Sequence, residues 1–531
     1  MTARTVKILV SDGLPAGVQE FLRAQPNWSV MDLTATKGNL AEEIRDADAL
    51  LIRAATRVTP ELLANAARLQ VIGRAGVGVD NVDLDAATQK GILVMNTPGG
   101  NAVSVAEHTF ALLLALAHHI VPADASMKQG RWDKKKFTGT ELRGKTLGLI
   151  GLGAIGGEVA RIAGAYQMNV IAFDPFIPRE RAAEQNINLV SFNDVMSKSD
   201  YVSLHCSLTP ETAHLINAKS LALMKSGARL VNCARGELID EAALLAALES
   251  GKLAGAALDV FEREPPGDSA LIRHPNVIAT PHIAASTEEA QELVGRRIAE
   301  QVRDYLISGV VRNAVNMPAV SSEEFKQMLP YVQLGEKLGS FLAQITGEPM
   351  REVRISYDGG LAELNTHLVR NAVLKGALGH VLAEPINLVN AGNLAQARGV
   401  EVAEMRSARR AAYSNSLGVS VGAGKTSVSV LGMIGANSMP RILGVNNIDV
   451  EAPLHGVLLL IRNDDVPGVI GRVGTVLGEH HINIANFTLG CKADSKEALG
   501  LVNVDQKLAP DVLDAIRKIP AIRMAQVIEI A

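Results

Sequence analysis

Three ionisable residues near the middle of the chain have the types and the setting of an active site. Arg235 follows the strand-like segment ARLVNCA, Glu264 follows LAGAALDVFER, and His282 follows VIATP. Ligands of parallel α/β sheets bind beyond the carboxyl ends of the strands, so these side chains are expected to converge there. A histidine can accept a hydroxyl proton, a carboxylate can orient the imidazole and raise its pKa, and an arginine can bind a carboxylate or polarise a carbonyl. Together they suit hydride chemistry on a hydroxy acid, although each alone is typical of a surface arginine or a turn.

A glycine-rich segment, GLGAIG, lies between the apolar run TLGLI and the helical pattern GGEVARIAGAYQ. It contains Gly151, Gly153 and Gly156, and Asp174 ends the next strand-like run, 21 residues after Gly153. This order predicts a dinucleotide site in which the glycines allow a tight turn and the pyrophosphate lies at the helix N-terminus. Asp174 would accept hydrogen bonds from ribose hydroxyls and repel a 2′-phosphate, which favours NAD over NADP. The alternative is a packed turn with a solvated carboxylate.

Composition excludes several classes of protein. The net charge of the 531-residue chain is −4 and aromatic residues make up 3%, which is unlike a nucleic-acid-binding chain. The cysteines Cys206, Cys233 and Cys491 are far apart and give neither a disulfide framework nor a metal motif. The longest strongly apolar run, 111–117, is far shorter than the roughly 18 residues of a membrane span. We therefore expect a cytoplasmic protein of three or four domains that binds neither nucleic acid nor membrane.

The elements predicted from periodicity form four groups. Apolar runs alternate with helical patterns over residues 1–98 and again from 145 to about 287, which indicates two parallel α/β units. A single Ala- and Leu-rich helix is predicted over 104–120 between them. Residues 313–320 are typical of a linker, and 321–450 mix helices with strands. The last 75 residues follow the ferredoxin-like order βαββαβ.

The motifs GLGAIG with Asp174, VNCARGELID, LDVFEREP and PHIAAST, in this order, resemble the D-isomer-specific 2-hydroxyacid dehydrogenases. The resemblance spans residues 1–317. It implies a Rossmann-like NAD-binding domain, residues 99–284, inserted in a flavodoxin-like substrate domain formed by residues 1–98 and 285–317. It also implies that Arg235, Glu264 and His282 are the catalytic residues. The helix starting near Asn101 resembles the dimerisation element of the family, so a homodimer or homotetramer is expected.

The same resemblance implies which residues contact NAD. They are Gly151, Gly153, Ala154, Ile155, Gly156, Asp174, Cys206, Cys233, Ala234, Asp259, His282 and Ala285.

Further motifs indicate the substrate. RAGVGVDNVD, NTPGGNAVSVAEH, RWDKKKFTGTEL and NAVNMPAV resemble family members that oxidise 3-phospho-D-glycerate to 3-phosphohydroxypyruvate, the entry step of L-serine synthesis. Such a substrate needs cations and amide donors, and Arg53 and Arg74 each follow a strand-like run in the first unit. A glycine-rich turn can aim backbone N–H groups at a carboxylate. The expected substrate residues are Arg53, Arg74, Val77, Gly78, Arg235 and His282. The lysines at 134–136 either add charge or form a solvated loop.

The C-terminal part resembles a regulatory region. NDDVPGVIGRV and HINIANFTLG resemble an ACT domain, expected over residues 453–531, and residues 318–452 resemble an α+β intervening domain. Such a domain often binds an amino acid between two copies, which implies an L-serine effector at Asn463, Asp465 and Asn483. A dimerisation module without a ligand is the alternative. The intervening domain could carry an allosteric anion site or serve only assembly.

Two patterns are interpreted as structural. GVSVGAGKT, residues 418–426, resembles a phosphate-binding loop, but Val419 stands where that pattern needs glycine, so a hairpin is expected. The pairs His118–His119 and His480–His481 are adjacent, and adjacent helical residues point about 100° apart, so we expect no metal.

Two other functions remain open from the sequence. One is a dehydrogenase for an unphosphorylated 2-hydroxy or 2-oxo acid, against which Arg53 and Arg74 argue. The other is a non-catalytic sensor that binds NAD and an amino acid, against which the set Arg235, Glu264 and His282 argues.

Overall fold

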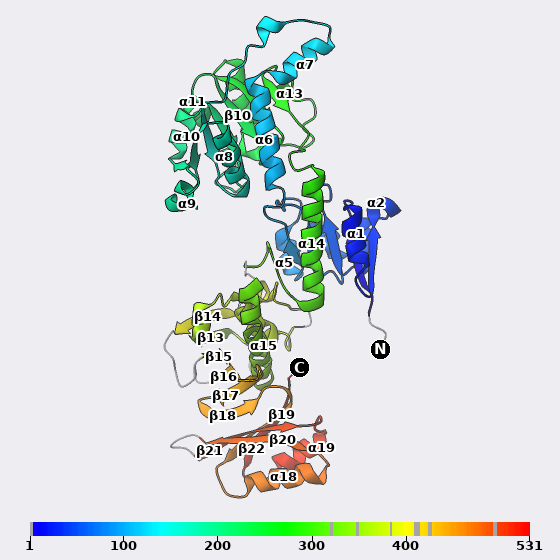
Figure 1. The fold of residues 1–531 in the computed structure, drawn as a ribbon. Coiled ribbons are helices and arrows are strands. Elements are labelled where there is room, and N and C mark those ends of the chain that lie inside the picture. The colour runs from blue at the N-terminus through cyan, green and yellow to red at the C-terminus, as the bar shows by residue number, and fades with distance from the viewer. Residues whose placement is uncertain are drawn as a thin grey trace.

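The structure is a computed structural model that describes residues 4–318, 322–346, 350–382, 385–407, 415–422, 427–491 and 496–530. Within these residues the strands form four sheets. Figure 1 shows the second sheet and its helices at one end, the first sheet with helix α14 in the middle, and the third and fourth sheets at the other end.

The first sheet is parallel, with the strand order β2-β1-β3-β4-β5. This 2-1-3-4-5 order is the flavodoxin-like one that the resemblance implied. Its strands are β1 (Val6–Val10), β2 (Trp28–Asp32), β3 (Ala49–Ile52), β4 (Val71–Arg74) and β5 (Leu93–Met95). The helices of this part are α1 (Ala16–Arg23), α2 (Leu33–Thr36), α3 (Leu40–Glu43), α4 (Pro60–Ala64), α5 (Leu84–Gln89) and α14 (Glu288–Ser308).

Helix α14 belongs to a distant part of the chain and covers one face of the first sheet. Its buried residues Val294, Ile298 and Val302 pack in the same core as the strands. A Cβ on Gly73 of β4 would come within 3 Å of the side chains of Ile298 and Val302, so the glycine lets the helix approach closely.

The second sheet is also parallel, with the order β12-β11-β10-β9-β6-β7-β8. Counted from β6, this is the 3-2-1-4-5-6 order of dinucleotide-binding folds with one more strand. The strands are β6 (Thr146–Ile150), β7 (Asn169–Phe173), β8 (Asn188–Leu189), β9 (Tyr201–Leu204), β10 (Ala228–Asn232), β11 (Leu253–Leu258) and β12 (Val277–Ala279). The helices are α8 (Ala154–Ala165), α9 (Arg179–Ala183), α10 (Phe192–Lys198), α11 (Ala218–Leu223), α12 (Glu241–Glu249) and α13 (Ala270–Arg273).

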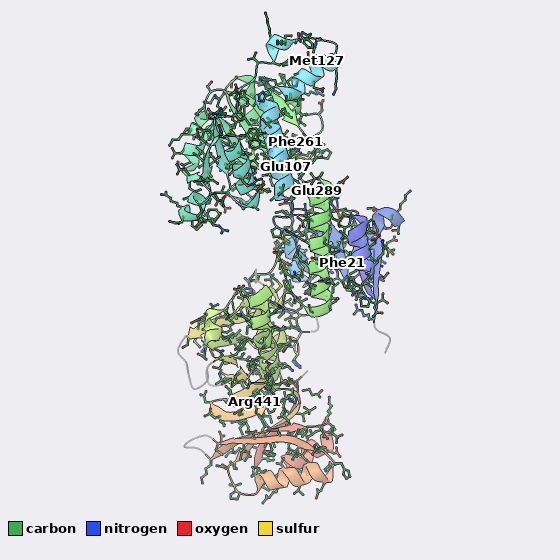
Figure 2. All side chains as sticks on the ribbon, in the orientation of Figure 1. Phe21, Glu107, Met127, Phe261, Glu289 and Arg441 are labelled. Carbon is green, nitrogen blue, oxygen red and sulfur yellow. The ribbon has the colours of Figure 1, made fainter. Side chains whose placement is uncertain are left out.

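The single helix predicted over 104–120 is two helices. Helix α6 (Ala102–Ala117) ends at His118, and α7 (Ile120–Lys128) begins after His119, whose φ of 51° is left-handed. The axes of α6 and α7 differ by 66°. Among the described residues no single helix is long and apolar enough to cross a membrane, and α6 with α7 passes that test only as a bent pair. Figure 2 places Met127 of α7 at the far end of the molecule, where its side chain is exposed.

The third sheet is mixed and has the order β14-β13-β15-β16-β17-β18. Its strands are β13 (Glu352–Gly359), β14 (Glu401–Ser407), β15 (Asn415–Val421), β16 (Val428–Ile434), β17 (Pro440–Val445) and β18 (Ile448–Pro453), with helices α15 (Ser322–Ile345), α16 (His367–Leu378) and α17 (Ala391–Ala397). Strands β15 and β16 pair antiparallel, as the hairpin prediction for the GVSVGAGKT segment requires. Residues 423–426 of that segment lie outside the described residues.

The fourth sheet is antiparallel and has the order β20-β21-β19-β22. It consists of β19 (Gly456–Asp464), β20 (Ile484–Cys491), β21 (Glu497–Val504) and β22 (Ile522–Ile530), with helices α18 (Val469–Glu479) and α19 (Pro510–Arg517). The sequence of elements is βαββαβ, which confirms the predicted order. One face of the sheet packs on the two helices, and residues such as Leu458 and Leu460 on the other face join the core that contains α15.

Glycines of the GLGAIG turn have different roles, which substitution can separate. A Cβ at Gly156 would overlap the carbonyl oxygen of Gly151, whereas a Cβ at Gly153 would meet nothing within 4 Å. We expect Gly156→Ala to lower the local opening free energy of α8 by about 1–3 kcal/mol, because the backbone must shift. The matched variant Gly153→Ala should lower it by less than about 1 kcal/mol. Hydrogen exchange of the α8 amides in the full chain measures both, and equal losses would contradict these roles.

Candidate active site

A histidine and a glutamate pair at the carboxyl edge of the second sheet. His282 follows β12, and its Nδ1 lies 2.7 Å from Oε2 of Glu264. The other oxygen of Glu264 accepts a hydrogen bond from the backbone N–H of Phe261 at 3.2 Å. Both side chains are partly exposed, 45% for His282 and 38% for Glu264. With the Nδ1 proton donated to the carboxylate, Nε2 is the atom that can accept a proton from a substrate.

A buried carboxylate fixes the turn that carries His282. Asp259 follows β11 and accepts hydrogen bonds from the N–H groups of Ile283 and Ala284, both at 2.9 Å, and from the Thr280 hydroxyl at 2.6 Å. His108 of α6 approaches it to 3.5 Å. Burial alone would raise the pKa of Asp259, but hydrogen bonds from His108, Thr280 and the backbone outweigh it, so the pKa is lowered. Asp259 was predicted as an NAD contact, and the structure places its carboxylate behind the histidine turn.

Arg235 reaches from the second sheet to the first. Its loop after β10 is held by Asn232, whose amide donates to the Arg235 carbonyl at 2.7 Å and accepts from the Ala234 N–H at 2.9 Å. The guanidinium Nη1 donates to the Ala234 carbonyl at 2.7 Å, and Nε donates to Oδ2 of Asp80 at 2.9 Å. Asp80 lies in the loop between β4 and α5, so this ion pair joins the edges of the two parallel sheets.

The arginines of the two sheets form a cluster of positive charge. Arg74 is partly buried, and its Nε has no hydrogen-bond partner among the described residues. The pKa of Arg74 is lowered to about 10, mainly by burial and also by the neighbouring charges of Arg235 and Arg53, while Asp80 and Asp12 oppose the shift. The charges of the three guanidinium groups repel one another, which makes the cluster a favourable place for an anion.

Glycines of the loop between β4 and α5 let two of these arginines lie against its backbone. A Cβ at Gly76, whose φ is 146°, would overlap Nη1 of Arg74, and a Cβ at Gly78 would overlap Nη2 of Arg235. A hydrogen bond from Asn96, just after β5, to the Val77 carbonyl at 2.6 Å holds the loop in place. The predicted substrate residues Arg74, Val77, Gly78 and Arg235 are therefore adjacent.

The glycine turn has the geometry that a dinucleotide needs. A Cβ on Gly151, at a φ of 94°, would clash with the backbone at His205 and Cys206, whereas Gly153 faces open space where a phosphate can approach. Asp174 accepts hydrogen bonds from the N–H groups of Leu152 and Phe176, both at 2.8 Å. Its carboxylate thus sits beside the turn with further lone pairs free for hydroxyl donors. These residues fit the nucleotide that the sequence implied.

The remaining predicted NAD contacts lie along the same edge. Ala154 and Ile155 begin α8, and Cys206, Cys233, Ala234 and Ala285 follow strands β9, β10 and β12. Burial raises the pKa of the Cys206 thiol to about 11 and that of Cys233 to about 12, so neither is a thiolate near neutral pH. Both cysteines act as small uncharged side chains at the carboxyl edge of the second sheet.

The predicted effector residues do not form one site within a single chain. Asp464 pairs with Glu497 at one end of β21, while Ile484 pairs with Val504 at its other end. Asn463 and Asp465 therefore lie at one end of the fourth sheet and Asn483 at the opposite end. Asn463 is buried and donates to the Asp464 carbonyl at 2.8 Å. These residues could share a ligand only between two copies of the domain.

Sequence reasoning missed two residues of this site. His108 and Asp80 stand within the motifs NTPGGNAVSVAEH and RAGVGVDNVD, but their roles depend on contacts with residues more than 150 positions away. In the part of the chain that the structure describes, no group of three or more His, Cys, Asp and Glu residues could hold a metal ion.

Comparisons with known proteins agree along the chain. It matches the D-isomer specific 2-hydroxyacid dehydrogenase NAD binding domain over residues 110–284, the D-3-phosphoglycerate dehydrogenase intervening domain over 327–446, and the ACT domain over 457–521. Among solved structures it resembles a D-lactate dehydrogenase from Aquifex aeolicus complexed with NAD and lactic acid. The TM-score is 0.52 and the identity 32%, over 59% of this chain and 100% of that one.

Relatives of similar length extend the match to the whole chain. The D-3-phosphoglycerate dehydrogenase of Methanocaldococcus jannaschii is 44% identical over 99% of this chain and 100% of its own. That of Bacillus subtilis is 42% identical over 92% of this chain and 93% of its own. The chain therefore belongs to the D-3-phosphoglycerate dehydrogenase family.

Proposed function

We propose that the chain oxidises 3-phospho-D-glycerate to 3-phosphohydroxypyruvate with NAD, as the entry step of L-serine synthesis. Two observations carry the proposal: the His282–Glu264 pair at the carboxyl edge of the second sheet, and the cluster of Arg235, Arg74 and Arg53, in which Arg235 joins that edge to the first sheet through Asp80. A substrate with a carboxylate, a secondary alcohol and a phosphate uses all of these groups.

The chemical step needs one hydride and one proton to leave the substrate. NAD, which the glycine turn and Asp174 would hold, would supply the acceptor for the hydride that leaves C2 of the hydroxy acid. The Nε2 atom of His282 accepts the hydroxyl proton as the C2–O bond becomes a carbonyl. Glu264, 2.7 Å from Nδ1, stabilises the imidazolium that results. Arg235 binds the carboxylate and polarises the developing carbonyl oxygen.

The phosphate of the substrate is assigned to arginines on the basis of charge. Arg74 and Arg53 bind the phosphate, because they carry the positive charge beside Arg235 to the ends of strands β4 and β3 of the first sheet. The backbone of Val77 and Gly78 lies between them and Arg235. In the second sheet, Asp174 favours NAD over NADP by accepting from the ribose hydroxyls, and the predicted NAD residues from Gly151 to Ala285 line the edge.

We also propose a regulated homo-oligomer in the cytoplasm. Val103, Ile120, Val121, Met127 and Trp132 expose apolar surface on and around α6 and α7, which suits an interface between copies. The cysteines Cys206, Cys233 and Cys491 are free, as in a reducing compartment. An L-serine effector would bind between two ACT domains, with Asn463 and Asp465 from one copy and Asn483 from the other.

Replacing His282 by alanine should abolish turnover and leave cofactor binding intact. Loss of the proton acceptor is expected to lower kcat by about 10²–10⁴-fold, while the Kd for NADH, measured by fluorescence, stays the same. The matched control is His214→Ala, which breaks a second His–Glu pair, with Glu262 at 3.0 Å. Turnover retained in His282→Ala would refute the proton-acceptor role.

Substrate choice is tested by comparing 3-phospho-D-glycerate with D-glycerate for the wild type and Arg74→Ala. We expect the wild type to prefer the phosphorylated acid. Loss of charge-assisted hydrogen bonds should cost Arg74→Ala about 1.5–3 kcal/mol, roughly 10–100-fold in kcat/KM, for this substrate only. The exposed Arg45, before β3, gives the control variant Arg45→Ala. Equal losses for both acids would remove the phosphate role, and a wild type without activity on the phosphorylated pair would refute the proposed substrate.

The effector assignment predicts that millimolar L-serine lowers turnover and that D-serine does not. Asp465→Ala and Asn483→Ala should each weaken inhibition while leaving activity without serine unchanged, because both residues lie in the fourth sheet. Isothermal titration gives the affinity independently of turnover. If L-serine changes neither activity nor heat of binding, the ACT domain is a dimerisation module.

A further inference from the structure

Asp80 holds the arginine that is assigned to the substrate carboxylate. Its Oδ2 accepts from Nε of Arg235 at 2.9 Å, and the side chain is 61% exposed against 29% for Arg235. The two residues come from different sheets: Asp80 lies in the loop before α5, and Arg235 follows β10. The ion pair therefore joins the two parallel sheets beside the arginine cluster.

All three nitrogens of this guanidinium already have a neighbour. Nε donates to Asp80, Nη1 donates to the Ala234 carbonyl, and Nη2 lies against Gly78. A carboxylate binds arginine best through two parallel N–H···O bonds along one edge. The edge formed by Nε and Nη2 becomes available only when Asp80 moves away.

Asp80 is also placed to neutralise the arginine cluster. Among the described residues it is the one carboxylate within ion-pair distance of Arg53, Arg74 or Arg235. Asp12, the other nearby acid, is engaged elsewhere: it accepts from the N–H groups of Arg53 and Thr56 and from the Thr56 hydroxyl. Asp80 thus stands in for a substrate carboxylate.

We propose that Asp80 is an internal counter-ion that competes with the substrate carboxylate for Arg235. Each anion that binds must displace it, so Asp80 sets a threshold of affinity. A small carboxylate that binds only Arg235 does not gain enough binding free energy to displace Asp80. A substrate that also binds Arg74 and Arg53 through a phosphate exceeds this threshold. This inference rests on the proposed function only in assigning a carboxylate to Arg235.

The test uses Asp80→Asn in the full chain with NADH bound and oxalate as the probe. The amide keeps the size of the side chain and removes its charge. A partly exposed ion pair contributes up to about 1 kcal/mol, so the Kd of oxalate should fall by about three- to fivefold. Asp80→Ala should tighten oxalate in the same direction. The matched control is Asp85→Asn, an exposed acid in the first turn of α5 with the same change of net charge, which should leave the Kd unchanged.

Other outcomes overturn the proposal. Weaker oxalate binding in Asp80→Asn would make Asp80 a group that orients Arg235 for the ligand, and an unchanged Kd would make the ion pair irrelevant to binding. Tightening of the same size in Asp85→Asn would assign the effect to net charge. Because oxalate carries no phosphate and is not turned over, this result is independent of whether the enzyme acts on 3-phospho-D-glycerate.

Discussion

The position of the His282 imidazole depends on one buried carboxylate. Asp259 is fully buried and binds the Thr280 hydroxyl and the N–H groups of Ile283 and Ala284, so the turn carrying His282 is tied on both sides. An ionised carboxylate without these donors would be costly at such a site, and removing them would leave an uncompensated charge. The need of the Asp259 carboxylate for hydrogen-bond donors therefore stabilises the turn, and in this turn Nδ1 of His282 lies 2.7 Å from Glu264.

The same buried charge links the active site to α6. His108 reaches Asp259 at 3.5 Å and the Thr280 hydroxyl at 3.2 Å, and Ser104 of the same helix bonds the Thr287 hydroxyl at 2.7 Å, just before α14. In Figure 1, α6 extends from the second-sheet part toward the middle of the molecule, and α14 runs along the first-sheet part. Helix α6 is thus bonded both to the residues that position His282 and to the residue that precedes α14.

The local pattern of apolar residues was sufficient to predict most strands and helices. It was insufficient to predict which side chains contact one another in the candidate site. Apolar runs such as ALLI and TLGLI predicted parallel strands, because a strand buried on both faces has no alternation. The break at His119 was missed because a left-handed conformation of a residue other than glycine leaves no mark in the sequence. The partners of Arg235 and Asp259, Asp80 and His108, were missed because they lie 155 and 151 positions away along the chain.

The placement of the effector residues had the same limit. The motifs around Asn463, Asp465 and Asn483 identify these residues as candidates. Only the strand register shows that Asn463 and Asp465 lie at one end of the fourth sheet and Asn483 at the other. The register of a strand is fixed by which of its residues are buried. In the fourth sheet both faces are buried, one against α18 and α19 and the other against the core that contains the third sheet.

Hydrogen bonds connect the fourth sheet with the first part of the chain by way of the third-sheet part. Gln344 of α15 donates to the carbonyl of Glu529 in β22 and accepts from its N–H, both at 2.9 Å. Asn387, just before α17, donates to the carbonyl of Gly91 at 2.8 Å, after the end of α5 in the first part of the chain. Helix α5 follows the loop that carries Gly76, Gly78 and Asp80. The loop that faces the arginines is therefore supported by the same body that holds the fourth sheet. Arg235 contacts that loop from the second sheet, through Nε to Asp80 and with Nη2 beside Gly78, so this ion pair ties the loop to the second sheet.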